Sequence, residues 1–307
     1  MENIIETKGL TKKYQKTTAV NYLNLRVERG EIYGFLGKNG AGKTTTIRLL
    51  MGLASPDKGE IYLFGREVEQ NRQMINQEIG AIIEDPGLYE NLTARENLII
   101  QKQLYGCRSE RIEEVLQTVG LEKTGKKKVK HFSKGMKQRL GIGLAILHEP
   151  DILILDEPTN GLDPTGIKEM RHLLKKMANE KEITIFISSH ILSEIQQIAD
   201  RVGIIREGKM IKEIDLEQFQ PDQSYILLET DSLKQAEATL TKLDLKYSIV
   251  SSIESLNHLL KVFCKRDLNP LLVQKLMENG IKIYRLEPVS ETLEDIFMSS
   301  MEVENLV

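Results

Sequence analysis

The stretch Gly37-Lys38-Asn39-Gly40-Ala41-Gly42-Lys43-Thr44 decides how the rest of the chain is interpreted. It fits the phosphate-loop pattern, in which two glycines bracket four residues and are followed by Lys and then Ser or Thr. Glycines let backbone N–H groups wrap closely around phosphate oxygens. Lys43 brings a positive charge to the outer phosphates, and the Thr44 hydroxyl can bind Mg²⁺. The sequence therefore predicts a nucleoside-triphosphate site built on this loop.

The segments on either side of the loop suit this interpretation. Glu31-Ile32-Tyr33-Gly34-Phe35-Leu36 is typical of a buried strand, and Ile47, Leu49 and Leu50 are typical of the core face of a helix. A helix that begins near Gly42 directs the positive end of its dipole at the same anion. The predicted phosphate-binding residues are Lys38, Asn39, Gly40, Ala41, Gly42, Lys43, Thr44 and Thr45.

Composition narrows the class of protein. The chain has 307 residues, enough for one large or two modest domains, and its formal net charge of −3 gives no support for a nucleic-acid partner. Cys107 and Cys264 are far apart and in no metal-binding or redox spacing, which favours free thiols in a reducing cytosol. The sequence has no run of about 18 apolar residues, so we expect no membrane-spanning segment. The N-terminus lacks the features of a signal peptide.

A second apolar segment ends in two carboxylates. Asp151-Ile152-Leu153-Ile154-Leu155-Asp156-Glu157 predicts a strand covered on both faces of a parallel sheet, and we expect it to lie beside the phosphate-loop strand. There Asp156 would hold Mg²⁺ through water, and Glu157, just past the strand end, would polarise the attacking water. His190 follows another buried strand, residues 183–188. A lone histidine is often structural, but this shared edge favours a contact with the γ-phosphate.

Several local signals mark helix starts and loops. Thr93-Ala94-Arg95-Glu96 is a capping box, Ser133 can cap the next helix, and Asp163 before Pro164 predicts a further helix start. The basic run Lys126 to His131 predicts a solvated loop, with a lipid-headgroup or partner contact as the alternative.

Tyr14 lies in a polar connection, Lys12 to Lys16. It is either a partly buried anchor or a stacking platform for an adenine ring, with Val20 packed nearby.

Other phosphate-loop enzymes are competing interpretations. Asp200-Arg201-Val202-Gly203 resembles one GTPase element, and Thr241-Lys242-Leu243-Asp244 resembles the guanine-reading element. The first precedes a short predicted hairpin, and the second lies on a predicted helix and not in a loop after a sheet strand. Both positions argue against a GTPase.

The pattern changes after about residue 216, and Pro221-Asp222-Gln223 is a candidate linker. Beyond it, over residues 222–300, the order strand, helix, strand, strand, helix, strand predicts a small α+β ferredoxin-like unit, followed by a last helix. This tail contains no catalytic cluster, so we expect a dimerisation or regulatory module.

Taken in their order along the chain, these motifs resemble those of one protein family. Over residues 1 to about 216, the chain resembles an ATP-binding-cassette (ABC) ATPase subunit. The matching segments are Gly37 to Thr45 (Walker A loop), Ser133 to Arg139 (signature motif), Ile152 to Glu157 (Walker B strand with its catalytic glutamate), Gly161-Leu162-Asp163 (D-loop) and His190 (switch histidine). The resemblance implies an α/β P-loop NTPase cassette with a parallel-sheet core, an antiparallel β subdomain and a helical subdomain at about residues 88–150.

The chain departs from the family pattern at three positions. Lys134 stands where the signature motif usually has its first glycine, and Met136 stands where it has glutamine. Glu84 replaces the usual Q-loop glutamine; a carboxylate still binds Mg²⁺ but adds negative charge beside Asp156 and Glu157. With the tail, Glu84 makes the chain similar to the subfamily that exports peptide antibiotics such as bacitracin.

The resemblance implies a set of roles and partners. Two cassettes, a homodimer or sister chains, would close head to tail on ATP and Mg²⁺ and drive a separate membrane permease through the groove around Glu84, at the cytoplasmic face of the membrane. Glu157 and His190 would be catalytic. Thr44, Glu84 and Asp156 would hold the metal, and the nucleotide contacts beyond the phosphate loop would be Tyr14, Val20, Ser133, Gly135 and Asp163.

Other functions stay open at this point. A soluble ABC protein that acts as a mechanical regulator usually carries two cassettes or a coiled-coil insert, and this chain has neither. An inactive module that only binds ATP, or an exporter of a lantibiotic or another hydrophobic compound, would share the same motifs. The sequence does not identify the transported substrate.

Overall fold

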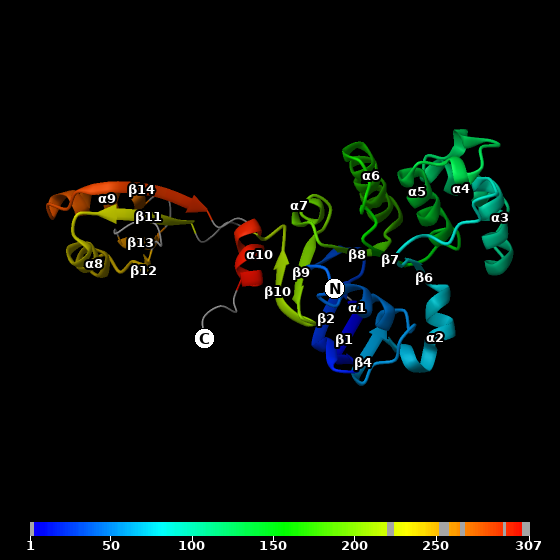
Figure 1. The fold of residues 1–307 in the computed structure, drawn as a ribbon, viewed down its shortest axis with the longest axis horizontal. Coiled ribbons are helices and arrows are strands. Elements are labelled where there is room, and N and C mark those ends of the chain that lie inside the picture. The colour runs from blue at the N-terminus through cyan, green and yellow to red at the C-terminus, as the bar shows by residue number, and fades with distance from the viewer. Residues whose placement is uncertain (1–2, 220–223, 252–257, 265–267, 291–292, 303–307) are drawn as a thin grey trace. The chain divides into compact units, whose positions relative to one another are not determined.

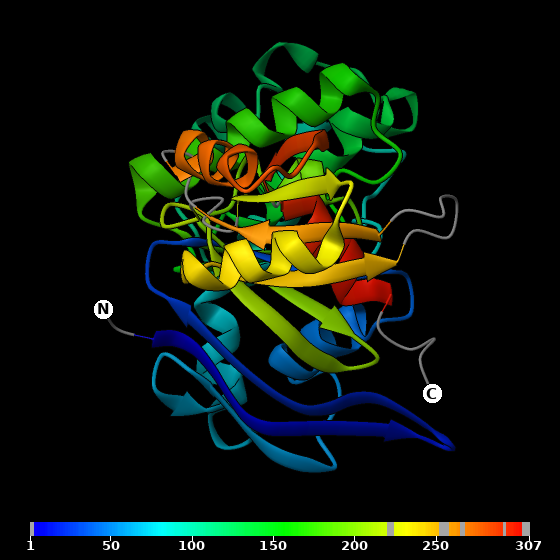
Figure 2. The same ribbon diagram turned by 90° about the vertical axis from the view of Figure 1, so that its left-hand side faces the viewer.

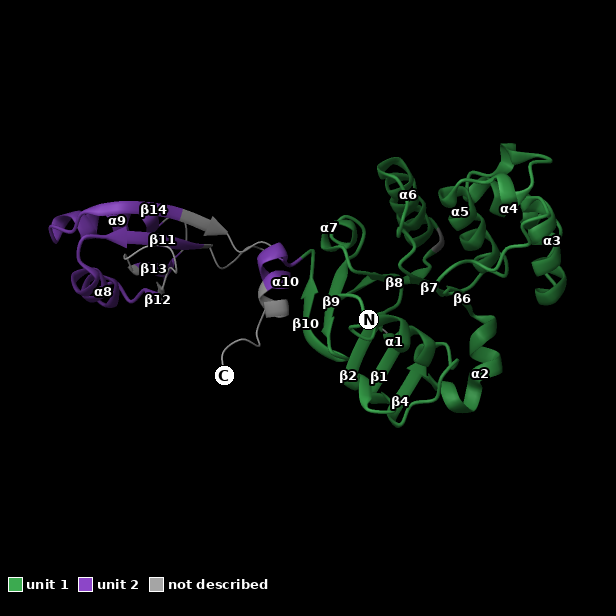
Figure 3. Cartoon of the chain, viewed as in Figure 1, with its two compact units in different colours: residues 1–217 green, residues 218–307 purple. Residues whose placement is uncertain are grey.

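The computed structural model describes residues 3–219, 224–251, 258–264, 268–290 and 293–302. The chain divides into two compact units, residues 1–217 and 218–307 (Figures 1 and 3). This division falls next to the predicted change of pattern at about residue 216. The predicted linker, Pro221-Asp222-Gln223, lies outside the described residues.

A six-stranded sheet in the order β10-β9-β3-β8-β7-β6 forms the centre of the larger unit (Figure 1). Five strands run parallel and β10 pairs antiparallel with β9; the bounds are β3 (Ile32–Leu36), β6 (Ile79–Ile82), β7 (Ile152–Asp156), β8 (Thr184–Ser189), β9 (Arg201–Arg206) and β10 (Lys209–Asp215). Every residue of β3, β7 and β8 is buried, as their continuous apolar sequences predict for parallel strands covered on both faces.

The expectation that the Asp156 strand lies beside the phosphate-loop strand is wrong. β8 lies between them and pairs with β3 on one side and with β7 on the other. The apolar pattern could not decide this order, because β7 and β8 are equally buried. The polar end of β8 forms hydrogen bonds to both neighbouring segments, which favours its central place. The backbone oxygen of Ser189 accepts from Gly37 N at 3.2 Å, and Ser188 Oγ donates to Asp156 Oδ1 at 2.5 Å.

An antiparallel sheet in the order β2-β1-β4-β5 covers part of this core. Its strands are β1 (Asn3–Tyr14), β2 (Thr17–Glu28), β4 (Lys58–Leu63) and β5 (Arg66–Glu67), and β1 and β2 run side by side over their length (Figure 2). Tyr14 was expected in a polar connection but is the last residue of β1. The strand continues there because Lys12 Nζ donates to Ser55 O and Lys13 N to Asp57 Oδ2.

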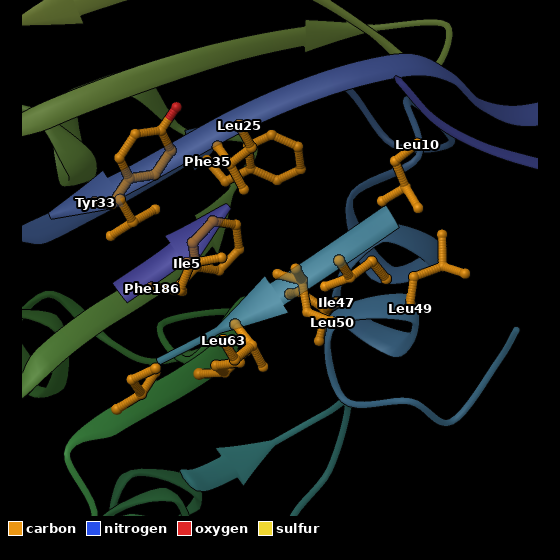
Figure 4. Close-up of a cluster of buried hydrophobic side chains, with 14 of the residues drawn as sticks. Ile5, Leu10, Leu25, Tyr33, Phe35, Ile47, Leu49, Leu50, Leu63 and Phe186 are labelled. Atoms are coloured by element: carbon orange, nitrogen blue, oxygen red, sulfur yellow. The ribbon is translucent and has the colours of Figure 1, made fainter. Parts of the chain in front are cut away.

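The main hydrophobic core lies between the two sheets and α1 (Lys43–Leu50). Ile47, Leu49 and Leu50 are fully buried, which confirms them as the core face of the helix (Figure 4). The rings of Tyr33 and Phe186 stack with centroids 5.7 Å apart. Burial of each such large apolar side chain contributes roughly 1.5–3 kcal/mol, so this cluster holds the start of α1 in place behind the phosphate loop.

Helices cover the remaining surfaces of the larger unit. They are α2 (Val68–Gln77), α3 (Ala94–Tyr105), α4 (Arg111–Thr118), α5 (Lys134–Ala145), α6 (Pro164–Lys181) and α7 (Leu192–Ile195), with short 3₁₀ turns at η1 (Glu122–Thr124) and η2 (Val129–His131). The predicted capping box of Thr93 and Glu96 is confirmed, as are the caps of Ser133 and Asp163. Sequence analysis did not predict α2. The basic run is exposed except for Val129, which anchors it.

A buried arginine joins two helices of the helical subdomain. Arg111 is 6% exposed, and its guanidinium donates to the carbonyls of Ile146 and Leu147, just beyond the last residue of α5. A second contact, from Nη1 to Glu114 at 2.8 Å, balances its charge. A cation at a helix C-terminus is favourable because the carbonyls there carry partial negative charge.

The smaller unit has the predicted order of elements. They are β11 (Ser224–Thr230), α8 (Leu233–Lys242), β12 (Lys246–Ser251), β13 (His258–Phe263), α9 (Asn269–Glu278), β14 (Ile283–Ser290) and α10 (Leu293–Glu302). The sheet is antiparallel in the order β12-β13-β11-β14. Alternate residues of β11 and β13 pack on α8 and α9 to form a separate core. The ferredoxin-like assignment itself stays a prediction. Among the described residues of both units, no helix has the length and hydropathy needed to cross a bilayer.

Glu31 lies just before β3, at the end opposite the phosphate loop. Its carboxylate accepts from Glu28 N at 2.7 Å and lies 3.6 Å from Arg201 Nε. Burial raises the pKa of Glu31 to about 7, and the Glu28 N–H and Arg201 only partly oppose that shift. In the pH range between its unfolded pKa and about 7, the folded chain keeps a proton that the unfolded chain releases. The stability that this proton contributes is therefore lost as the pH rises through about 7.

We expect Glu31→Gln to flatten this pH dependence, because glutamine can still accept from Glu28 N but does not ionise. The free energy of unfolding, measured by urea denaturation from about pH 5 to 8, should fall with pH by about 1–3 kcal/mol less in the variant. Glu69→Gln, at an exposed position, is the control. Parallel curves for Glu31→Gln and the unmodified chain would contradict the expectation.

Candidate nucleotide-binding site

The phosphate loop connects β3 to α1 and presents an open outer face. Gly42 precedes α1 with φ 107°, and a Cβ there would lie 2.3 Å from Ala19 O, so only glycine fits. Lys38, Asn39 and Gly40 are exposed. Because backbone N–H groups at such a loop bind phosphate oxygens, the conformation suits the predicted role.

Lys43 is the buried cation of the site, with 5% of its surface exposed. Its ammonium donates to Gly37 O at 2.7 Å and Lys38 O at 3.2 Å, and it lies 3.1 Å from Glu157 Oε1. The carbonyls hold the ammonium against the loop. A phosphate group bound in the loop would compete with Glu157 for this positive charge.

Thr44 and Asp156 bring two oxygen ligands together from different elements. Thr44 Oγ1 donates to Asp156 Oδ2 at 2.7 Å, and Asp156 is 5% exposed. Within the described residues, no cluster of three or more His, Cys, Asp or Glu side chains is suited to hold a metal ion. A hydroxyl and one carboxylate fit Mg²⁺, which usually takes its other ligands from water and substrate phosphates.

Glu157 and His190 form a second pair at the same edge. Glu157 has a left-handed backbone, φ 47°, and its N–H donates to Ser188 O at 3.2 Å and Ser188 Oγ at 3.0 Å. His190 Nδ1 lies 3.0 Å from Glu157 Oε2. The turn lifts the Glu157 carboxylate out of the sheet to a position between Lys43 and His190. Sequence analysis placed these residues at one edge, and the structure brings them into contact.

Sequence analysis missed Ser188. Its hydroxyl donates to Asp156 and accepts from the N–H of Glu157, so one buried side chain orients both acids. The available signal was weak: a hydroxyl residue at the end of an apolar strand, in register with Asp156 only if the strands are neighbours.

Ser133, Gly135 and Asp163 are placed at helix starts. Ser133 Oγ accepts from Met136 N at 3.2 Å, and Asp163 Oδ1 accepts from Gly166 N at 2.8 Å. The first turn of α5 packs near the loop that follows Glu157, because a Cβ at Gly135 would lie 3.8 Å from Leu162 Cδ2. A cavity of about 300 Å³ separates this helix start from the carboxylates.

Three predicted residues lie apart from these contacts. Glu84 shares the cavity, but its carboxylate is 65% exposed and bonds Arg48 Nη2 at 2.6 Å. Tyr14 is 46% exposed, with Lys12 Nζ 5.5 Å from its ring centre. Val20 is fully buried in the core, so the structure does not bring it to an exposed surface beside Tyr14.

Comparison with known proteins agrees with this geometry. The family profile described as ABC transporter matches residues 20–160. The bacitracin transport ATP-binding protein BcrA of Bacillus licheniformis is 46% identical over 300 residues, covering 97% of both chains. This chain belongs to the family of ABC transporter ATP-binding proteins. BcrA of Enterococcus faecalis is 42% identical over 97% of this chain and 96% of its own length. The family assignment supports ATP binding and hydrolysis as the basic activity.

Similarity to two other proteins is confined to about the length of the larger unit. The lantibiotic transport ATP-binding protein SrtF of Streptococcus pyogenes is 45% identical over 68% of this chain and 90% of its own length. A solved ATP-binding subunit of an ABC transporter is 34% identical, with a TM-score of 0.62, over 70% of this chain and 90% of that chain.

A dimeric ATP-binding cassette, solved in a post-hydrolysis state with ADP and Pi, is 26% identical. Its TM-score is 0.64 over 70% of this chain and all of that chain. The comparisons confirm the predicted α/β P-loop cassette fold.

Ser188→Ala should lower both stability and activity, because it leaves the Glu157 N–H with one acceptor and Asp156 with one donor fewer. We expect a loss of about 1–3 kcal/mol in the free energy of unfolding and a clear fall in the kcat for ATP hydrolysis. The matched control is Ser189→Ala, since in the described part of the chain that hydroxyl bonds only to the backbone of Ile191. Equal effects of the two substitutions would show that Ser188 does not orient the acids.

Proposed function

We propose that the chain is the ATP-hydrolysing subunit of a membrane ABC transporter that exports or removes a peptide antibiotic such as bacitracin through a separate permease. The observation that carries the proposal is the 46% identity to BcrA over 97% of both chains. Because this match includes the smaller unit as well as the cassette, it supports a shared role and not only a shared fold. We assign the cassette to residues 1–216 and an accessory domain to residues 222–300.

The phosphate loop and its neighbours would bind ATP with Mg²⁺. The N–H groups of residues 38–45 and the Lys43 ammonium would hold the phosphates. Thr44 and Asp156 would hold Mg²⁺, which neutralises phosphate charge when it is bound. Glu84 could join them after releasing Arg48. Tyr14 would stack on the adenine ring, with Val20 supporting it from the core.

Glu157 and His190 would carry out the hydrolytic step. Glu157 would accept the proton of the attacking water, because its carboxylate stands past the strand end and beside the ammonium that binds the outer phosphates. His190 would orient that carboxylate through Nδ1 and present its other ring nitrogen to the γ-phosphate. The protein thus acts by positioning and by charge stabilisation.

A second cassette would complete the site. Ser133 and Gly135 at the start of α5, and Asp163 of the D-loop, would face the nucleotide bound to a partner chain. The dimeric relative bound to ADP and Pi supports such pairing. The pair would work at the cytoplasmic face of the membrane.

A groove in the larger unit would receive the permease. A cavity of about 270 Å³ is lined by strand β6, the loop after Glu84 and helices α3 and α5, including Asp85, Pro86, Gly87 and Tyr105. Tyr105 of this lining is 41% exposed, and its neighbour in the chain, Leu104, is 76% exposed. Exposed large apolar side chains at a groove are typical of protein contacts. The groove adjoins Glu84, so motion there could reach the nucleotide site.

Transport of a lantibiotic is the second candidate. It is favoured by the 45% identity to SrtF, but that match covers only 68% of this chain. A soluble mechanical regulator remains a different class of function, and it requires no permease.

Glu157→Gln should separate binding from hydrolysis. We expect ATP turnover to fall by about 100-fold or more, while ATP binding and ATP-dependent dimerisation persist, because the phosphate loop and Lys43 are unchanged. Equilibrium binding, size-exclusion chromatography and phosphate release measure the three properties. Lys43→Ala is the reference variant and should lose ATP binding. Normal turnover by Glu157→Gln would refute Glu157 as the base.

Removal of this gene should increase the bacitracin sensitivity of its host, and only a hydrolysing copy should restore resistance. The minimal inhibitory concentration is measured with the unmodified gene, with Glu157→Gln and with an empty vector, in the presence of the permease gene. Restoration by Glu157→Gln, or equal sensitivity of all strains, would contradict the proposal. Sensitivity to a lantibiotic alone would favour the second candidate.

A further inference from the structure

Lys134, the first residue of α5, is electrostatically unfavourable at the start of its own helix. Lys134 stands where the helix dipole is positive, and the first turn of α5 contains no acidic residue. Across the described ranges, the Lys134 ammonium has no hydrogen-bond or ion-pair partner. A residue that breaks a local rule without a local gain is a candidate for a functional role.

The Lys134 ammonium packs over the loop that follows Glu157. A Cβ at Gly161 would lie 2.5 Å from Lys134 Nζ and 3.4 Å from its Cε, so the space left by glycine is filled by the lysine. The next residue of α5, Gly135, faces Leu162 of the same loop. Two successive residues of α5 therefore rest on the loop of residues 160–163 within one chain.

Lys134 also faces the carboxylates of the site. Among the described residues, it is the one cation that lines the cavity of about 300 Å³. The lining residues are Thr44, Glu84, Asp85, Lys134, Gln138, Asp156, Glu157 and Asn160. Gln138, one turn further along α5, is 6% exposed and lines the same cavity. This face of the helix is thus directed at a strongly acidic surface, where a positive charge lowers the electrostatic repulsion.

The loop beneath Lys134 is tied directly to Glu157. Asn160 N donates to Glu157 O at 3.0 Å, and Leu162 N donates to Thr159 O at 3.1 Å. These turns follow the left-handed backbone of Glu157 without a break. A displacement of residues 160–162 would therefore be transmitted to the Glu157 carboxylate.

We propose that Lys134 is a positioning residue for ATP hydrolysis that acts within its own chain. Its ammonium, packed on Gly161, holds the loop of residues 160–163 and balances the acidic cavity, so that the Glu157 carboxylate keeps its place beside Lys43. The inference rests on the proposed role of Glu157 as the base.

Lys134→Met and Lys134→Arg test this role in the purified full-length chain with ATP and Mg²⁺. We expect Lys134→Met to lower kcat about tenfold with KM changed less than about twofold, and Lys134→Arg to retain most of the activity. The control is Lys176→Met on α6, since Lys176 is exposed, pairs with Glu180, and lies outside the signature motif and the cavity lining. Lys134→Met relieves the conflict with the helix dipole but increases the repulsion among the acids of the cavity, so we expect its Tm to change little. A loss of kcat of about tenfold at nearly unchanged Tm separates the effect on catalysis from unfolding.

A double-mutant cycle with Gly161→Ala tests the contact itself. The alanine methyl group would displace the lysine, so kcat should fall in the Lys134 background and fall less in the Lys134→Met background. Additive effects, an unchanged kcat in Lys134→Met, or a change in KM alone would each overturn the inference. Loss of turnover in Glu157→Gln together with normal turnover in Lys134→Met would overturn this inference and leave the proposed function standing.

Discussion

The candidate site depends on one constraint: parallel strands of a single sheet end at the same edge. β3 leads into the phosphate loop. β8 carries Ser188 near its end and is followed by His190, and β7 ends at Asp156 and is followed by Glu157. No long-range rearrangement is needed to bring Lys43, the proposed metal ligand Asp156 and the proposed base Glu157 together, because strand pairing has already aligned their backbones. The side-chain bonds of Ser188 then fix the two acids relative to each other.

The chemistry available at this edge of the sheet depends on how the positive charge of Lys43 is balanced. Lys43 is almost fully buried, and its ammonium is shared between loop carbonyls and Glu157. A buried cation is tolerated only when its charge is balanced and its donors are satisfied. In the proposed mechanism this ammonium would turn from Glu157 to the bound triphosphate, and the exchange would free the Glu157 carboxylate to act on water.

Much of the fold and site could be predicted from the sequence because the signals were local. The glycine spacing of the phosphate loop, the capping box at Thr93 and the apolar strands each depend on neighbours in the chain. The failures involve contacts between distant segments. Strand order could not follow from two equally apolar strands, and Ser188 became visible only once β8 was known to lie beside β7. Tyr14 belongs to a strand and not to a loop because Ser55 and Asp57 accept hydrogen bonds from the residues before it, Lys12 and Lys13.

The left-handed backbones of Glu84 and Glu157, with φ values of 64° and 47°, have a consequence for the evolution of this protein. A residue with a Cβ pays roughly 1 kcal/mol or more to adopt such a conformation, whereas glycine adopts it freely. Selection for thermal stability alone would therefore favour glycine or asparagine at both positions. Glu149, Glu182 and Glu207 have the same conformation, so the strain alone does not mark a functional acid. Replacing these three by glycine is therefore a route to a more stable chain that leaves the proposed roles of Glu84 and Glu157 intact.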